Sequence, residues 1–230
     1  MKNYLLCAVL LFLAISCSTE SDYEHSQNVD SKEIALRTSS QIPKNKRNPF
    51  DERGKEYFDL LTIYLKNNKV PNSISELTDR TQFLLKNYGD ARFLSKTNTT
   101  FTAKQAALLM GGFEKPITDF LESYNVTPEV KRYLINFVQA LLAQEGQEYN
   151  ELYSYIVSFE TSILRSNTLN DDGKETILTV SSITTYALYI DPKHKDRDWE
   201  ISVANKKVEP VFNSHRASII SVIALVKTLF

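Results

Sequence analysis

Apolar residues recur at helical spacing along most of the chain after Pro49. In the stretch "FDERGKEYFDLLTIYLKNN", residues 50–68, they occupy positions i, i+3, i+4, i+7 and i+8, which are Tyr57, Leu60, Leu61, Tyr64 and Leu65. This period belongs to an α-helix with one buried face, whereas a half-buried strand alternates every second residue. Six glycines and seven prolines in 230 residues are too few for a loop-rich β architecture. We therefore predict an all-α fold.

Several helix starts are marked by capping signals. Ser73 and Glu76 have the spacing of a capping box, in which two side chains satisfy two free backbone N–H groups, and Thr102 and Gln105 repeat it. Thr127-Pro128 supplies an N-cap followed by proline at the first helical position, where a missing N–H costs nothing. Further boundaries are predicted at Gly89, Pro116 and Gly146.

The stretch "KETILTVSSITTYALYI", residues 174–190, is rich in β-branched residues, which favour strands. Because its apolar residues keep helical spacing, we predict a helix that Pro192 ends, with a strand as the alternative. The residues that follow are the least regular of the chain, with a short helix near Trp199. The tail "SHRASIISVIALVKTLF", residues 214–230, is apolar on nearly every side over about ten residues, whereas a membrane span needs about 20. We therefore predict a buried closing helix.

This pattern divides the chain into three parts. A leader covers residues 1–16, a flexible tether covers residues 17–49, and a single helical domain covers residues 50–230. The tether is assigned because residues 18–48 are polar and aperiodic and have almost nothing to bury. The domain is long enough for one hydrophobic core and holds no cysteine, so burial rather than disulfides must stabilise it. We predict an irregular bundle of about six to eight helices.

The first residues, "MKNYLLCAVLLFLAIS", have the plan of a secretory signal. Lys2 precedes a short apolar run, and the small residues Ala14 and Ser16 stand before the expected cut. The run is too short for a bilayer core of roughly 30 Å, so we expect no transmembrane anchor. Cleavage after Ser16 would make Cys17 the first residue and the only thiol, because Cys7 leaves with the leader.

The motif "LAISC", residues 13–17, resembles the lipobox of bacterial lipoproteins, in which the cysteine carries acyl chains such as palmitate and becomes the mature N-terminus. The resemblance implies that Cys17 is a lipid-attachment site. An unpaired thiol is a liability in an oxidising compartment, which favours lipidation over plain secretion. The motif departs from the lipobox at one point, because Ala14 stands where leucine is preferred and Leu13 lies one place earlier. Two or more acyl chains give a firm anchor, since each buried methylene contributes about 0.8 kcal/mol.

The residues after this cysteine, "STESDYE", are acidic and include no basic side chain. They resemble the export signal of surface-exposed lipoproteins of the Bacteroidetes. This implies an anchor in the outer membrane with the domain at the cell surface, and the periplasmic face is the alternative. The stretches "NPFDERGKEYFDLL" and "FETSIL…KETILTVSSITTYALY" are similar to exported helical proteins of the Bacteroidetes with no assigned activity. That resemblance supports the location and the fold class and implies no mechanism.

Side chains that hold metals or cofactors are scarce. The histidines, His25, His194 and His215, lack metal-ligand spacing and the domain has no thiol, so we expect no zinc site and no cofactor. The sequence "TLNDDG", residues 168–173, lacks the first and last ligands of a calcium loop and is better explained as a turn before a helix. There is no phosphate-binding loop, dinucleotide fingerprint or nucleophile elbow. A formal net charge of −1 gives no field that would attract nucleic acid.

Two groups of residues remain as candidates for a site. Glutamates that the fold brings together can act as acid and base, although helix surfaces carry such residues routinely; the candidates are Glu145, Glu148, Glu151 and Glu160. Tyrosine pairs at helical spacing suit ligand binding when they are exposed. Rings at the edge of the core with wet hydroxyls explain the same pairs more simply; the pairs are Tyr149 with Tyr153 and Tyr186 with Tyr189.

The sequence therefore favours a membrane-anchored lipoprotein whose helical domain binds a protein or a cell-envelope component. We predict no catalytic residues. An envelope enzyme that uses carboxylates brought together by the fold is the first alternative, and a protective or immunity-like envelope factor is the second. An exposed apolar patch would favour binding, whereas a cleft with two close, buried carboxylates would favour catalysis.

Overall fold

The computed structural model describes residues 43–89, 100–111, 114–199, 212–227 and 229. The compact helical unit begins at Pro43, so residues 43–49, which the sequence assigns to the tether, belong to this unit. The leader, Cys17 and the rest of the predicted tether lie outside the described residues.

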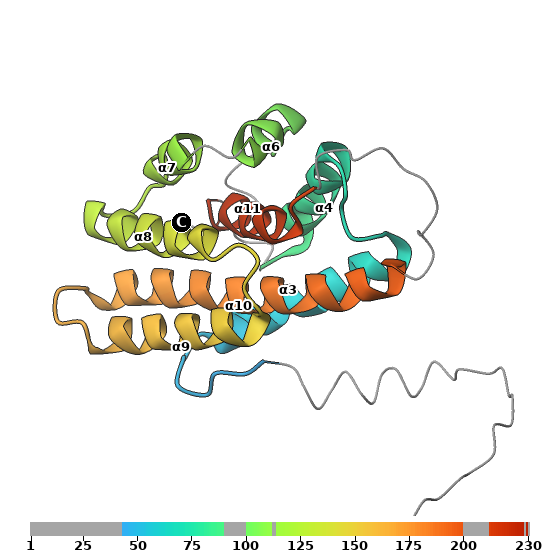
Figure 1. Cartoon of the computed structure of the whole chain (residues 1–230). Coiled ribbons are helices and arrows are strands. Elements are labelled where there is room, and N and C mark those ends of the chain that lie inside the picture. The colour runs from blue at the N-terminus through green and yellow to red at the C-terminus, as the bar shows by residue number, and fades with distance from the viewer. Residues whose placement is uncertain (1–42, 90–99, 112–113, 200–211, 228, 230) are drawn as a thin grey trace, which may run out of the picture. The chain divides into compact units, whose positions relative to one another are not determined.

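Eight helices and no strand make up the described part of the chain (Figure 1), which confirms the prediction of an all-α fold with about six to eight helices. Under the labels of Figure 1 they are α3 (Asp51–Asn67), α4 (Ile74–Asn87), α6 (Ala103–Met110), α7 (Glu114–Glu122), α8 (Pro128–Ala143), α9 (Tyr149–Arg165), α10 (Asp171–Trp199) and α11 (Ser214–Val226).

The central element is α10, which packs most extensively against α3 and also contacts α11, α9 and α8 (Figure 1). Every side chain from Thr176 to Ile190 is buried. Its hydroxyl-bearing residues tolerate burial because they bond within the helix. Thr184 Oγ1 donates to the Val180 carbonyl at 2.8 Å, and Thr185 Oγ1 donates to the Ser181 carbonyl at 3.0 Å. The helix prediction for residues 174–190 is confirmed over the strand alternative.

The end of α10 differs from the prediction. The sequence predicts that Pro192 ends the helix and that an irregular segment follows, but α10 continues to Trp199. A proline removes its own N–H from the helical ladder and so loses one hydrogen bond, while the turns on either side can keep theirs. Similarly, α7 begins at Glu114 rather than at Pro116. Pro116 therefore lies in the first turn, where a helix leaves its N–H groups free in any case.

The closing helix α11 is buried on every side from Ala217 to Val226, as predicted. It packs against α10, α4 and α6. Among the residues that the structure describes, no helix is long and apolar enough to cross a membrane.

The capping signals form largely as predicted. Thr102 and Gln105 make a complete capping box, and the Thr127 hydroxyl accepts from the backbone N–H of Val130 at 3.4 Å. At α4 the Ser73 hydroxyl accepts from the N–H of Glu76, but the Glu76 carboxylate accepts from the N–H of Asn72 instead of that of Ser73. At α4 the capping serine bonds as predicted, but the glutamate bonds to the N–H one residue before it, so the capping box is incomplete.

Close contact between α3 and α10 depends on Gly54. Its backbone N–H donates to Ser182 Oγ at 3.1 Å, and the same Oγ donates to the Asp51 carbonyl at 3.1 Å. A Cβ atom at position 54 would lie 2.7 Å from the Ser182 carbonyl oxygen and closer still to Ser182 Oγ and Tyr186 Cδ2. The absent side chain lets the two backbones approach and places Asp51 beside α10.

Candidate functional site

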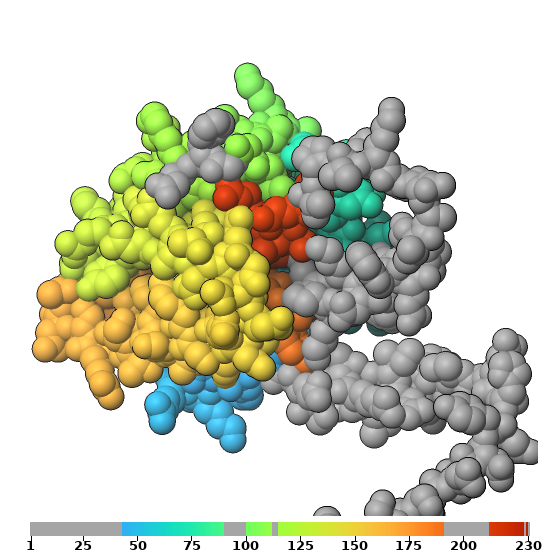
Figure 2. Space-filling view, in the orientation of Figure 1, coloured from blue at the N-terminus to red at the C-terminus, as the bar shows by residue number. Residues whose placement is uncertain are grey.

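Residues of α6 and α7 line an apolar groove. These two helices lie at the edge of the bundle (Figure 1) and their surfaces are green in Figure 2. The volume of the groove is about 620 Å³, which falls within the range of about 300–1,000 Å³ typical of ligand sites. Leu108 at its margin is 59% exposed, the largest exposure among the large apolar side chains described, while Leu109 is buried. The full lining is Gln105, Leu108, Leu109, Lys115, Pro116, Asp119, Phe120 and Ser123.

The two charged side chains that line the groove, Lys115 and Asp119, neutralise each other. Lys115 Nζ lies 3.1 Å from both carboxylate oxygens of Asp119, one helical turn away on α7. Lys227 Nζ lies 4.7 Å from the centre of the Phe120 ring, within the range of a cation–π contact. With its charged lining residues paired, the groove offers a ligand mainly apolar surface and shape.

A second group of polar side chains surrounds Glu160 of α9. We call residues 43–50, the segment before α3, the strap. Asn45 and Asn48 of the strap donate from Nδ2 to the Glu160 carboxylate at 2.5 and 2.6 Å. Ser181 Oγ of α10 donates to it at 2.8 Å. Glu160 is 2% exposed, so the expectation that this glutamate lies on a solvated helix face is wrong.

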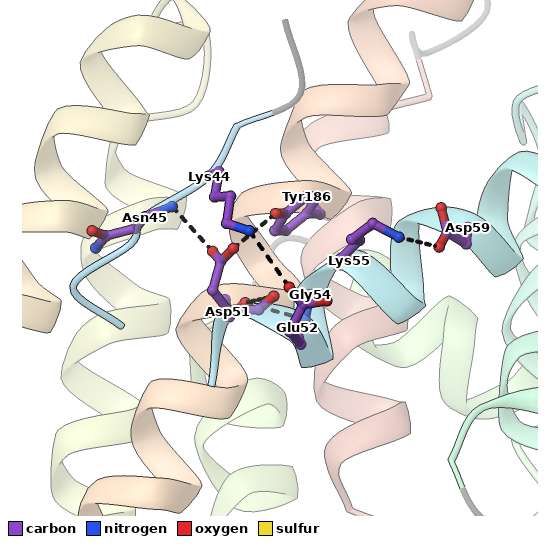
Figure 3. Close-up of polar contacts among 9 residues, drawn as sticks. Lys44, Asn45, Asp51, Glu52, Gly54, Lys55, Asp59 and Tyr186 are labelled. Atoms are coloured by element: carbon purple, nitrogen blue, oxygen red, sulfur yellow. Dashed lines mark hydrogen bonds and ion pairs between the residues drawn. The ribbon is translucent and has the colours of Figure 1, made fainter. Parts of the chain in front are cut away.

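Asp51, at the start of α3, adds a second buried carboxylate to this polar cluster, and Figure 3 shows its contacts with Asn45 and Tyr186. Its carboxylate accepts from the backbone N–H of Asn45 at 3.1 Å and from the Tyr186 hydroxyl at 3.1 Å. The nearby ammonium group of Lys44 points to Glu52, 3.5 Å away at the surface. No lysine or arginine of the described chain forms an ion pair with Asp51 or Glu160.

Burial is the largest influence on the pKa of the Glu160 carboxyl and raises it, while the three donated hydrogen bonds lower it, and the net shift is upward. The negative charge of Asp51 raises the pKa of Glu160 further. Burial also raises the pKa of Asp51 itself, against the lowering effect of its hydrogen bonds with Asn45 and Tyr186 and of the positive charge of Lys44. Both shifts have the sign expected of carboxylates withdrawn from water, where burial outweighs the groups that favour the charged form.

A catalytic pair would consist of two close, buried carboxylates that line a cleft, and this pair lacks the cleft. The two groups are buried and interact electrostatically, but neither lines either of the two cavities described. The second cavity, of about 310 Å³, lies on the outer side of α3 around Ile63. Since donors from the protein fill the carboxylate positions, the cluster is organised to hold the strap rather than to contact a substrate.

Tyr149 and Tyr153 are half-buried at the edge of the core, as the simpler interpretation predicts, whereas Tyr186 and Tyr189 lie inside the core. Tyr149 stacks on Tyr153 with ring centres 6.0 Å apart, and Tyr149 also contacts Tyr189 at 5.3 Å. Tyr186 and Tyr189 are 1% and 6% exposed. The prediction of wet hydroxyls is wrong for Tyr186, because that hydroxyl donates to Asp51 inside the cluster.

The other predicted candidates are distributed over the surface. Glu145 pairs with Arg216 at 3.0 Å and accepts from Asn213, and so joins the end of α8 to the start of α11. Glu148 caps α9 without a side-chain hydrogen bond, and Glu151 is exposed. The fold therefore does not gather the four glutamates into one site.

The remaining sequence candidates have structural roles. Burial lowers the pKa of His215, whose ring nitrogen lies 3.2 Å from the Leu141 carbonyl oxygen. In "TLNDDG", Asn170 Oδ1 accepts from the N–H of Gly173 at 2.9 Å at the start of α10, which agrees with a turn before a helix. No group of three or more potential metal ligands occurs among the described residues. His25 lies outside them.

Comparison of the chain with protein-family models finds no match, and comparisons with curated proteins and with solved structures also find none.

Proposed function

We propose that this protein is a lipid-anchored envelope protein whose helical domain binds a partner protein through the groove between α6 and α7. The anchor is proposed from the leader and from Cys17 in "LAISC". The acidic residues that follow the cysteine support an outer-membrane location with the domain at the cell surface. Binding is proposed from a single observation, an open apolar groove with Leu108 59% exposed at its margin.

The chemistry of the groove favours an apolar segment of a protein as the ligand. An isolated exposed leucine is ordinary, but Leu108 adjoins Leu109, Pro116 and Phe120 in one concave surface. A groove between two helices suits an amphipathic segment that inserts apolar side chains at helical spacing. The only charged lining residues, Lys115 and Asp119, pair with each other, so the lining itself carries no net charge to recognise a phosphate or a polyanion.

Catalysis is not favoured by any observation at this site. The groove is lined by one aspartate, and that aspartate is engaged by Lys115. The buried carboxylates of the strap region do not line it. The observations therefore support binding over the enzyme alternative.

We expect Leu108→Glu to abolish partner binding. A leucine buried on binding contributes about 1.5–3 kcal/mol, so a loss of at least about tenfold in captured partner is expected, and the introduced charge adds to it. The full mature variants are used as bait for envelope extracts, and captured proteins are quantified by mass spectrometry against wild type.

Ile63→Glu is the matched control, because Ile63 is 50% exposed and lies on α3 outside the groove. The proposal requires a specific protein that Ile63→Glu retains and Leu108→Glu loses. Equal capture by both variants, or a loss confined to Ile63→Glu, contradicts binding through the α6–α7 groove. Circular dichroism of both variants shows that they are folded.

A further inference from the structure

The exposed face of α6 is almost free of polar side chains. Three of its four exposed residues are apolar, and the four are Ala103, Lys104, Ala107 and Leu108. A helix whose outer side faces only water normally carries charged and polar residues there, as α3 does at most of its exposed positions. An apolar exposed face beside an open groove is typical of a surface that another protein covers.

On this surface a projecting apolar side chain stands directly beside a hollow. Leu108 is 59% exposed at the margin of the groove, and Leu109, Pro116 and Phe120 belong to the lining of the same groove. A two-fold interface brings the same patch of two copies together, so a projection on one copy meets the hollow of the other only when one patch contains both. The surface of α6 and α7 meets this condition, and the exchange buries two copies of Leu108 in each dimer.

The charges of the two helices favour the same arrangement. The sequence of α6 contains one lysine and no acidic residue, whereas that of α7 contains three acidic residues and one lysine. A two-fold axis at the margin of the groove places α6 of each copy against α7 of the other, and so brings unlike charges together. Lys104 of α6 and Glu122 of α7 are exposed, and neither forms an ion pair among the described residues. The small side chains of Ala103 and Ala107 let a second helix approach α6 closely.

We propose that the partner in the α6–α7 groove is a second copy of this chain, in a two-fold dimer in which Leu108 of each copy fills the groove of the other. The inference rests on the proposed role of the groove in protein binding and names the partner. Each groove is completed by a side chain of the second copy. Helices of eight and nine residues form an interface at the small end of the range for specific complexes, so we expect a weak, reversible dimer.

Photo-crosslinking of the full mature chain tests the dimer. Because the domain holds no cysteine, Ala103→Cys places a single thiol at the edge of the exposed face of α6, where a benzophenone maleimide is attached. The labelled protein is mixed with a heavy-isotope copy of the wild-type chain and with envelope extract, so that a second copy and other proteins compete for the groove. After irradiation, mass spectrometry identifies the cross-linked peptides. We expect cross-links from position 103 to α7 of the heavy copy.

Variants carried by both copies show whether the cross-link depends on the groove. Leu108→Glu should lower its yield by at least about tenfold, because a buried leucine is lost on each side of the dimer. Lys104→Glu, which keeps the projecting leucine, should lower it by about twofold or more, because it places a like charge against α7. Ile63→Glu, on α3 outside the groove, should leave it unchanged. Circular dichroism shows that the variants are folded.

The identity of the cross-linked peptide separates the dimer from the more general proposal. A cross-link to a protein of the extract instead of the heavy copy, if Leu108→Glu removes it, overturns the dimer and leaves the groove as a binding site for another protein. If no cross-link is weakened by Leu108→Glu, both the dimer and the proposed role of the groove are overturned. A cross-link to the heavy copy that lies outside α7 overturns the two-fold arrangement.

Discussion

Replacing Gly54 with alanine should destabilise the domain by about 3 kcal/mol, near the upper end of the range for overpacked cores. The new Cβ overlaps both the Ser182 backbone and the Tyr186 ring, so α3 and α10 must separate to admit it. Alanine gains up to about 1 kcal/mol of helix propensity over glycine, which the overlap exceeds. Urea unfolding of the two proteins measures the difference.

Gly146→Ala is the control for this prediction. Gly146 has a positive φ of 90°, and no atom lies within 4 Å of the position of its Cβ. Alanine at this position makes no steric overlap, so the only cost is the positive φ, which destabilises a residue with a side chain by about 1–2 kcal/mol. A Gly54→Ala variant no less stable than Gly146→Ala would show that the α3–α10 contact tolerates a side chain, contrary to the packing described.

The second large effect is expected at the strap. Asn48→Ala should destabilise the domain by about 3 kcal/mol, because it removes a donor from the buried Glu160 carboxylate and another from the Leu178 carbonyl. Hydrogen bonds to charged groups contribute about 1.5–3 kcal/mol each, and an orphaned buried acceptor adds to the loss. Unfolding by urea at pH 7, followed by circular dichroism, gives the value.

A double-mutant cycle shows whether this loss comes from the carboxylate. On a Glu160→Gln background the charge-assisted bond is absent, so the effect of Asn48→Ala should shrink by at least about 1.5 kcal/mol. Additive effects would mean that Asn48 acts independently of Glu160, in conflict with the hydrogen bond between them. Burial lowers the pKa of His215, so its charge also depends on pH, and all four proteins are therefore compared at one pH.

The helices could be predicted from the sequence because their information is local. The apolar spacing and the capping residues of a helix lie within a few positions of each other in the sequence. The capping box at Thr102 and the N-cap at Thr127 are both present in the structure, as predicted. The end of α10 could not be predicted from Pro192 alone, because proline disfavours a helix without excluding it. The burial of α10 from Thr176 to Ile190 follows from its partners α3, α8, α9 and α11, most of which are distant in sequence.

One local feature of the sequence marks the polar cluster. Glu160 falls on the apolar stripe of α9, between Ile156 and Ile163, both of which are fully buried. A charged residue on such a stripe indicates a buried carboxylate that needs partners. Its partners Asn45 and Asn48 precede it by 115 and 112 residues, in a segment that reads as tether, and nothing local connects them.

The groove was also beyond prediction, for a related reason. Leu108 and Phe120 belong to separate short helices, and each stretch is an ordinary amphipathic segment on its own. A concave surface arises only from how α6 and α7 pack against each other and their neighbours α4, α11 and α8. The lack of metal-ligand spacing, by contrast, is visible in the sequence itself, because its three histidines are far apart.

The anchor at Cys17 is the claim on which the proposed location depends, and the mass of the mature N-terminal peptide tests it most directly. Protein isolated from its native envelope is digested, and the first peptide is identified by mass spectrometry. We predict a peptide that begins at Cys17 and carries acyl chains on that residue. A peptide that begins elsewhere, or one that begins at Cys17 with a bare thiol and a bare amine, would contradict the lipid anchor.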